Sequence, residues 1–341
     1  MSGLEMIDGR RIWLFLLLVP ILCAASTASA IGEPTPPGRE SYIRMQLNDG
    51  RVLFAGGADD NGHPIKRAEI FDPSANKFRP SGAMVVPRCG PTATLLPNGS
   101  VLIAGGATCS DAPAPIATLE VFDPASGTFH AAVDLIYPRF DLNAMLLKNG
   151  KVLIAQGYDG AHNLVGPAEI FDPVLAIMQR GGSMVIPRCF GSETQLPGDQ
   201  VLIAGGVRCD EPEREAITAA EIYDPAGQFG RVGAMNTARV CHSATVMKNG
   251  KVLIAGGASA LANGIALSSA EIYDPDKATF APTGSMTKAR ACPTATARDD
   301  GTVVVKGGHS QSAPDSPPVD LTDSEIFDPT TGKFTAASLA E

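Results

Sequence analysis

Short apolar runs recur along the chain, each bounded by turn residues. The run Val101–Ala104 contains no polar position, and an alternating segment at 91–96 precedes it. An unbroken apolar run of this length is typical of a strand that is covered on both faces. Asn98-Gly99 separates the two segments and favours a tight hairpin, because both central positions of such a turn need positive φ. The pattern therefore predicts antiparallel strands joined by short turns.

One such pattern is repeated six times. Each unit begins with Arg, passes through the hairpin to a Gly-Gly pair, and closes after a variable loop with Glu-apolar-aromatic-Asp-Pro. The second unit predicts four strands, at about 91–96, 101–105 and 119–122 and near Phe129. The Gly-Gly pairs stand at 56–57, 105–106, 205–206, 256–257 and 307–308, with Gln156-Gly157 as the one variant. The Asp-Pro motifs begin at Asp72, Asp123, Asp172, Asp224, Asp274 and Asp328, every 49 to 54 residues.

These units resemble kelch repeats, whose period is about 50 residues. Two stretches that carry the resemblance read ARVCHSATVMKNGKVLIAGG and AEIYDPDKATFAPTGSM. The chain is similar to secreted bacterial kelch proteins and to the central propeller of galactose oxidase over about residues 39–338. The resemblance implies an all-β fold over 39–341, a six-bladed kelch-type β-propeller with four antiparallel strands per blade. It implies no particular function, because this fold hosts unrelated ones.

The two ends of the repeat array predict how the ring closes. Residues 41–47 serve as the first strand of the first blade, and the last strand ends near Ser338. Every blade is then one contiguous segment, so the first and last blades meet only by packing. We expect this junction to be the weakest in the ring. The segment 174–181 departs from the pattern, because Met178 stands where the other units have an aromatic residue.

The N-terminus has the pattern of a secretory signal. Arg10 and Arg11 precede an apolar run at 12–25, and small residues with alanine at 28 and 30 follow it. This predicts a signal peptide over 1–30, cleaved after Ala30, and a short Pro-rich linker over 31–38. The alternative is a membrane anchor, for which the run is short. We expect a secreted or periplasmic protein without membrane insertion.

The composition argues against one class of fold and one class of partner. The chain has 36 glycines and 27 prolines in 341 residues, which argues against a mainly helical protein. The formal net charge is −9 and the sequence pI about 5.1, which argues against a nucleic-acid partner. Ligand identity and oligomeric state stay open.

Six cysteines follow the predicted signal, which suggests disulfides in an exported protein. Cys89 and Cys109 are equidistant from Gly99, and Cys189 and Cys209 are equidistant from Asp199. Such pairs face each other across a hairpin, so we predict one disulfide in each, with buried thiols as the alternative. Cys241 and Cys292 fill the same slot in adjacent units and can join two blades.

An arginine opens every unit and a glutamate precedes every Asp-Pro motif. The arginines by family resemblance open the strand nearest the axis, so they can form a ring of donors for an anionic or polar ligand. The alternative is internal pairing, because an unpaired buried carboxylate is costly. Both roles can coexist. The arginines are Arg39, Arg88, Arg139, Arg188, Arg239 and Arg290, and the glutamates are Glu69, Glu120, Glu169, Glu221, Glu271 and Glu325.

The loops between the second and third strands vary most and lie on the face where the arginines enter. They span about 58–67, 107–118, 158–167, 207–219, 258–269 and 309–323. Several are acidic, with Asp59, Asp60, Asp111, Asp159, Asp210, Glu211, Glu213 and Glu215. A solvated face is the first interpretation, and binding of a cation or a basic partner is the second. The segment that begins at Asp59 lacks the twelfth-position glutamate of a calcium loop.

Catalytic patterns are sparse. Galactose oxidase-like chemistry needs copper held by His and Tyr with a Tyr-His dipeptide, which this sequence lacks. His63, His162, His242 and His309 can converge on the mouth and bind a metal, but they lack short ligand spacing. We expect no metal and no cofactor. The sequence favours an exported, non-catalytic binding module for a glycan or protein at the loop-bearing mouth. The alternatives are a galactose oxidase-like or other carbohydrate-active enzyme and a structural module of the cell envelope.

Overall fold

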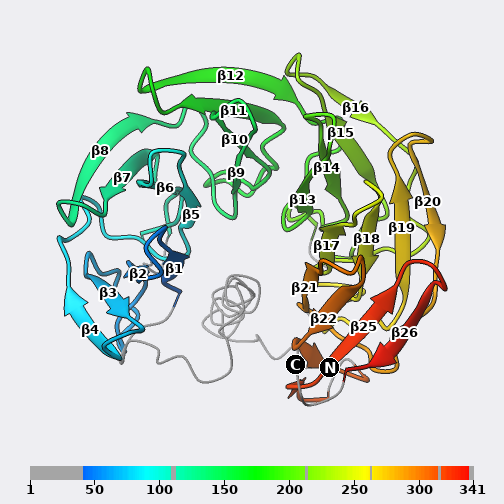
Figure 1. The fold of residues 1–341 in the computed structure, drawn as a ribbon. Helices are drawn as coiled ribbons and strands as arrows, with labels where there is room; N and C mark the ends of the chain where they lie inside the picture. Colours follow the sequence, from blue (N-terminus) through cyan, green and yellow to red (C-terminus); the bar gives the residue numbers. More distant parts are fainter. Residues whose placement is uncertain (1–40, 109–112, 212–213, 262, 314–315, 338–341) are drawn as a thin grey trace, which may run out of the picture.

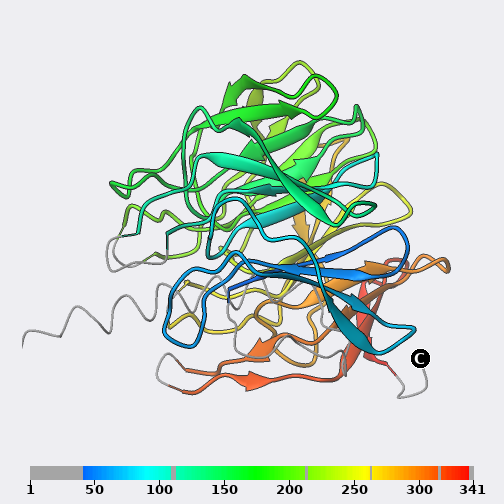
Figure 2. The ribbon, with the colours of Figure 1, turned by 90° about the vertical axis from the view of Figure 1, so that its left-hand side faces the viewer.

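The computed structural model describes residues 41–108, 113–211, 214–261, 263–313 and 316–337. They form six four-stranded antiparallel sheets, each from one contiguous segment, which we call blades one to six. Figure 1 shows the blades around a common axis, and Figure 2 shows the ring from the side. The first strand of each blade lies nearest the axis and the fourth lies outermost. The predicted six-bladed propeller is confirmed.

Blades one to three contain the first twelve strands. Blade one consists of β1 (Ile43–Gln46), β2 (Val52–Ala55), β3 (Ala68–Asp72) and β4 (Lys77–Pro80). Blade two consists of β5 (Thr92–Leu95), β6 (Val101–Ala104), β7 (Thr118–Asp123) and β8 (Thr128–Asp134). Blade three consists of β9 (Asn143–Leu146), β10 (Val152–Ala155), β11 (Pro167–Asp172) and β12 (Ile177–Ser183).

Blades four to six follow in chain order. Blade four consists of β13 (Ser192–Gln195), β14 (Val201–Ala204), β15 (Ala220–Tyr223) and β16 (Phe229–Arg231). Blade five consists of β17 (Ser243–Val246), β18 (Val252–Ala255), β19 (Ala270–Asp274) and β20 (Thr279–Pro282). Blade six consists of β21 (Thr294–Ala297), β22 (Val303–Lys306), β25 (Ser324–Asp328) and β26 (Lys333–Ala336). A two-stranded sheet, β23 (His309–Ser310) with β24 (Val319–Asp320), lies in the last loop, where the sequence predicted no strand.

The second strand of each blade is the centre of its packing. In blade four, Val201 and Ile203 pack against Leu153 of blade three. Leu202, on the opposite face of the same strand, packs against Val252 of blade five. All five side chains are fully buried. Unbroken apolar runs therefore arise because each second strand is covered by a neighbouring blade on both sides.

The Gly-Gly pairs allow close backbone approach where the second strand ends. Both glycines of this pair in the second blade, Gly105 and Gly106, have positive φ. A Cβ on Gly106 would stand 2.7 Å from the carbonyl oxygen of Cys89, closer than side-chain carbons are found. A larger residue here would push the first and second strands apart.

Met178 fills the aromatic slot of blade three without disturbing the sheet. It lies opposite Phe171 in the register of β11 and β12, as Phe78 lies opposite Phe71 in blade one. The fourth strand therefore forms at the expected place. The turn before it is unusual because Val174 is 90% exposed.

The junction between blades six and one differs from the others. Val303 and Val305 pack on blade five, so the alternate side chains Val304 and Lys306 face away from it, on the side where Figure 1 shows blade one standing apart. Lys306 is exposed. Each of the other blades has a fully buried alanine at this position, namely Ala55, Ala104, Ala155, Ala204 and Ala255. Among the described residues the first and last sheets share no strand. That this junction is the weakest stays a prediction.

In the described part of the chain, no helix is long and apolar enough to cross a membrane.

Candidate functional site

The repeated arginines and glutamates form buried ion pairs in blades two to six. In blade four, Nη2 of Arg188 lies 2.7 Å from Oε1 of Glu221, and both side chains are fully buried. Nη1 of Arg188 donates to the carbonyls of Gly205 and Ala219, where the second strand ends and the third begins. The other pairs are Arg88–Glu120, Arg139–Glu169, Arg239–Glu271 and Arg290–Glu325.

Each glutamate also fixes the connection from the preceding blade. The carboxylate of Glu221 accepts the backbone N–H groups of Val185 and Ile186 at 2.7 and 2.9 Å. Burial lowers the pKa of Arg188, and the charge of Glu221 opposes that shift. Since the carboxylate satisfies donors from two directions, the pair tethers neighbouring blades as well as its own strands.

Blade one has a different partner for its glutamate. Nη2 of Arg67 lies 2.5 Å from Oε1 of Glu69, whereas Arg39 lies outside the described residues. The five described arginines have no exposed side-chain surface. Ligand binding by the arginine ring stays a prediction, and the observed contacts of these side chains are internal.

The residue two positions after each arginine stands just before the first strand of its blade, and we call these six residues the rim positions. These rim positions have φ between 48° and 58° in all six blades and are half-buried. The same backbone conformation thus carries five different residue types, with cysteine at two of the six positions. The rim positions are Ser41, Gly90, Asp141, Phe190, Cys241 and Cys292.

An ionisable cluster lies on the rim where blade three meets blade four. Asp141 forms a hydrogen bond with Tyr158, which begins a loop of blade three, and interacts with Arg214 from a loop of blade four. Burial raises the pKa of Asp141 to about 6, and Arg214 and Tyr158 oppose that rise. The ring of His162 stacks on Tyr158 at 5.6 Å between centroids. A carboxyl and a phenol are therefore hydrogen-bonded here, and the charge of Arg214 acts on the carboxyl.

Below this cluster, the junction of blades three and four departs from the repeat. Gln156 replaces the first glycine of the Gly-Gly pair and has φ 65°. Its amide donates to the carbonyl of Gly191 and to Oε1 of Glu193, at 3.1 and 2.9 Å, and accepts the N–H of Gly191. Burial raises the pKa of Glu193 to about 7, so its carboxyl is neutral in mildly acidic solution. The inner strands β9 and β13 approach less closely than those of four other neighbouring pairs.

Two substitutions compensate for each other here. At other junctions a glycine of one blade faces a larger residue of the next, as Gly105 faces Leu142 and Gly205 faces His242. At this junction the larger residue is Gln156 and the small one is Gly191, whose added Cβ would lie 2.8 Å from Oε1 of Gln156. The exchange keeps the junction filled and brings a polar group to Glu193.

We expect Gly191→Ala to be destabilising by about 1–3 kcal/mol, because it overpacks this junction. In a Gln156→Gly background the same change should cost much less, since the clashing amide is gone. Urea denaturation of the four proteins of this cycle measures the coupling. Equal costs of Gly191→Ala in both backgrounds would contradict the compensation.

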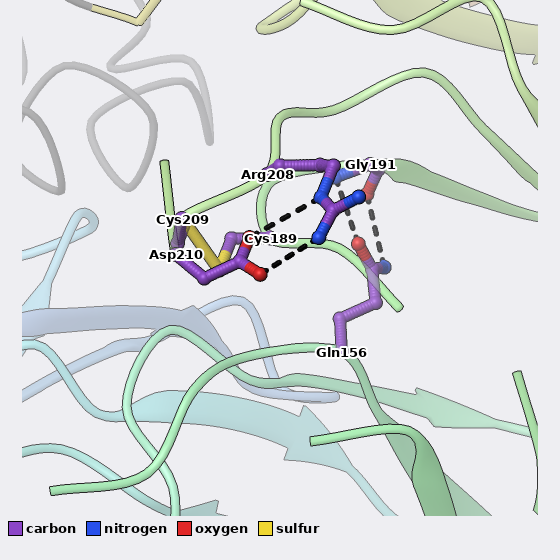
Figure 3. Close-up of a disulfide and its surroundings, with 6 residues drawn as sticks. All are labelled: Gln156, Cys189, Gly191, Arg208, Cys209 and Asp210. Atoms are coloured by element: carbon purple, nitrogen blue, oxygen red, sulfur yellow. Dashed lines mark hydrogen bonds and ion pairs between the residues drawn. A yellow bond between two sulfur atoms is a disulfide. The ribbon is translucent and has the colours of Figure 1, made fainter. Parts of the chain in front are cut away.

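Two disulfides among the described residues agree with the predicted pairs. Cys189 and Cys209 are bonded within blade four, and Cys241 and Cys292 join blades five and six. Figure 3 shows the Arg208–Asp210 ion pair beside the first disulfide. Cys89 is disulfide-bonded, and its predicted partner Cys109 lies outside the described residues. Disulfides persist in oxidising compartments, which is compatible with export.

The strand register places the centre of the Cys189–Cys209 hairpin one residue away from the position that the cysteine spacing indicates. Ser192 pairs with Ala204, so Cys189 faces Val207 and its disulfide partner lies two residues further along. The centre of the hairpin is therefore Gly198 rather than Asp199. The diagonal arrangement is still within disulfide reach, at 6.1 Å between the two Cα atoms.

The acidic loop residues mostly serve their own loops. Oδ1 of Asp59 accepts the backbone N–H groups of Asn61 and His63, and these bonds help to lower its pKa. Asp159 accepts N–H groups in the same way in blade three. Asp210 and Glu211 pair with Arg208, whereas Asp111 and Glu213 lie outside the described residues.

The histidines lie in different surroundings. Nε2 of His242 is 2.9 Å from Oγ of Ser192, and His309 is a residue of β23. Within the described ranges, no group of three His, Cys, Asp or Glu side chains could hold a metal ion.

The six radial sheets define the chain as a six-bladed β-propeller. The chain is similar to kelch-repeat relatives and to propellers of known structure, and both similarities support a kelch β-propeller. No protein-family model matches the chain.

The curated relatives match the chain in part. It is 23% identical to alpha-scruin of Limulus polyphemus over 237 residues, which is 63% of this chain and 25% of scruin. It is 32% identical over 114 residues to an F-box/kelch-repeat protein of Arabidopsis thaliana, covering 33% of this chain and 26% of that protein. The chain thus spans about a quarter of the length of each.

Two solved structures share the fold. A fungal alcohol oxidase of the AA5 family, in complex with copper, superposes with a TM-score of 0.67 at 17% identity. The match covers 89% of this chain and 65% of the oxidase. YjhT superposes with a TM-score of 0.63 at 14% identity, covering 89% of this chain and 99% of YjhT. At these identities the likeness concerns the fold alone.

Proposed function

We propose that this protein is an exported, non-catalytic binding module that takes a glycan or protein partner at its loop-bearing mouth. The observation that carries the proposal is the rim cluster of Asp141, Tyr158 and Arg214. These groups come from loops of two blades held on a rigid scaffold, which is where binding sites are usually built. The neighbouring rim residue Phe190 is half-buried and adds an aromatic surface beside the polar groups.

The rim chemistry favours the part of the mouth at blades three and four. Cys241 and Cys292, at blades five and six, are bonded to each other in a disulfide, so their sulfurs are not free to contact a partner. Gly90 offers no side chain. Asp141 and Phe190 are thus adjacent rim positions with groups that can recognise a partner by hydrogen bonding and stacking.

The predicted export of the chain supports the choice of a glycan or an exported protein as the partner. The N-terminal pattern of residues 1–30 and the disulfides of blades four to six fit an oxidising compartment outside the cytoplasm. Partners available there are glycans and other exported proteins. A role as a structural module of the cell envelope is the variant of this proposal in which the partner is an envelope component.

A glycan array with the purified chain tests the proposal. We expect Arg214→Ala to weaken binding of a recognised glycan by about tenfold, the size of one lost directed contact. Lys248→Ala, in a hairpin at the other end of blade five, should bind like the wild type. Copper in stoichiometric amount together with turnover of sugars or alcohols would overturn the non-catalytic proposal in favour of an oxidase.

A further inference from the structure

Five asparagines of this chain are each followed by glycine, a dipeptide that reacts with itself. The backbone nitrogen of the glycine attacks the side-chain amide of the asparagine, because no Cβ on the glycine hinders the approach. The five dipeptides begin at Asn61, Asn98, Asn149, Asn249 and Asn263. One folded molecule therefore places the same reactive pair in five different surroundings.

Four of the five glycine nitrogens are held by a backbone hydrogen bond. Each donates its N–H to the carbonyl three residues earlier, at 2.8 to 2.9 Å. The pairs are Gly62 with Asp59, Gly99 with Leu96, Gly150 with Leu147 and Gly250 with Met247. Attack requires the nitrogen to give up this proton and to face the asparagine side chain, and the hydrogen bond opposes both.

The side chains of three of these asparagines are fixed as well. Oδ1 of Asn98 accepts the backbone N–H of Ser100 at 3.0 Å. The same contact recurs in blades three and five, where Asn149 and Asn249 accept from the residue two positions later. The hairpin turns of blades two, three and five therefore restrain both partners of the reaction.

The dipeptide Asn263-Gly264, in the mouth loop of blade five, lacks these restraints. Asn263 is exposed and has φ 55°. Of the residues that the structure describes, none accepts a hydrogen bond from the N–H of Gly264, and none bonds to the side chain of Asn263. The attacking nitrogen and the amide that it attacks are both unengaged here.

The shape of this loop itself favours the reactive pair. Residue 263 is in the left-handed region, which asparagine tolerates better than most residues. A Cβ on Gly264 would stand 2.2 Å from the carbonyl oxygen of Ala260, so this position has no room for a side chain. The turn is closed by Ser259, which exchanges two hydrogen bonds with Ile265.

We propose that Asn263 is a self-modification site at the mouth of the propeller. The nitrogen of Gly264 forms a bond to Cγ of Asn263, and the Cγ–Nδ2 bond breaks. The amide nitrogen leaves as ammonia with the proton that Gly264 loses, and a cyclic imide remains. Water then opens either side of the imide and yields aspartate or isoaspartate. Water is the one co-reactant, and nothing is oxidised or reduced.

The product changes the contact between two mouth loops. The N–H of Leu261 donates to the carbonyl of Arg214 at 3.1 Å, and the N–H of Ala216 donates to the carbonyl of Ser259 at 3.0 Å. Conversion of Asn263 adds a negative charge to the loop of blade five. The isoaspartyl form also adds one carbon to the backbone within the turn. We expect this longer turn to loosen the pairing with the loop of blade four.

Peptide mapping by mass spectrometry of the full chain, aged in neutral buffer, tests the site. Asn263 should convert about tenfold or more faster than each of the other four asparagines, the factor that one backbone hydrogen bond supplies. Those four are matched controls, since they share the dipeptide, the buffer and the molecule. In denaturant, where the hydrogen bonds are absent, all five should convert at similar rates.

Hydrogen exchange of the Leu261 amide measures the effect on the loops. Asn263→Gly keeps the turn, because glycine adopts positive φ freely, and it removes the reactive side chain. Fresh wild type and fresh variant should protect this amide equally. After ageing, the wild type should lose protection in proportion to the isoaspartate formed, whereas the variant should keep it.

Two results would overturn the proposal. One is similar conversion of all five asparagines in the folded chain, and the other is an intact Asn263 where the denatured chain reacts. Conversion without any loss of Leu261 protection would overturn the effect on the loops. None of these results depends on a bound partner, so they leave the proposed binding function to its own test.

Discussion

Arg188→Ala should lower the free energy of unfolding by about 3–5 kcal/mol, the usual cost of removing one partner of a buried ion pair. The variant leaves the carboxylate of Glu221 fully buried without its cation. It also removes the donors to the carbonyls of Gly205 and Ala219. Chemical denaturation measured at one pH gives the difference directly.

Arg208→Ala is the matched control in the same blade. The side chain of Arg208 is 47% exposed beside Asp210, so we expect a cost of about 1 kcal/mol or less. A similar cost for both variants would contradict the assignment of Arg188 to the scaffold. Arg188→Ala also tests the ligand-binding ring. Lost glycan binding with an unchanged denaturation curve would assign this arginine to the ligand.

Removal of the inter-blade disulfide should have an effect of comparable size. Cys241→Ser combined with Cys292→Ser opens a loop closed across 51 residues, for which chain entropy predicts a loss of about 4 kcal/mol. Differential scanning calorimetry of the double variant measures the fall in Tm. The sulfurs join two blades, so their loss should weaken the docking of blade six as well.

The disulfide of blade four provides the comparison. Cys189 and Cys209 are only 20 residues apart, and the same entropy argument gives about 3 kcal/mol for their loss. The inter-blade variant should therefore have the lower Tm of the two. An inter-blade variant that melts with the wild type would show that packing alone holds blade six in place.

The architecture could be predicted from the sequence because each blade repeats the same order of four strands and the same pattern of apolar residues. Apolar runs such as Val201–Ala204 are unbroken because neighbouring blades cover both faces of the strand. The Arg–Glu pairs could be anticipated because six charges at fixed phase in a buried strand need partners. The hairpin centre was misplaced by one residue, since register depends on the turn geometry rather than on the spacing of the cysteines.

The candidate site could be predicted only in part. Gln156 is visible in the sequence as the one exception to the Gly-Gly pairs, but its partners Gly191 and Glu193 lie 35 and 37 residues further along. Their contact crosses from one blade to the next, which a single repeat unit does not show. Glu193 has a signal of its own, an acid where four blades have alanine. Comparison of equivalent positions across blades would have found it.

Lys306, in the second strand of the last blade, also affects whether one molecule can stack on another. Stacked blades are open-ended in principle, because an apolar face of one sheet accepts the next. Five blades offer such a face, with a buried alanine at its inner end. Lys306 ends the series, since burying its ammonium group under another sheet would destabilise the contact by more than the apolar packing would stabilise it. The sixth blade therefore acts as a terminal cap that discourages one molecule from continuing into another as a filament.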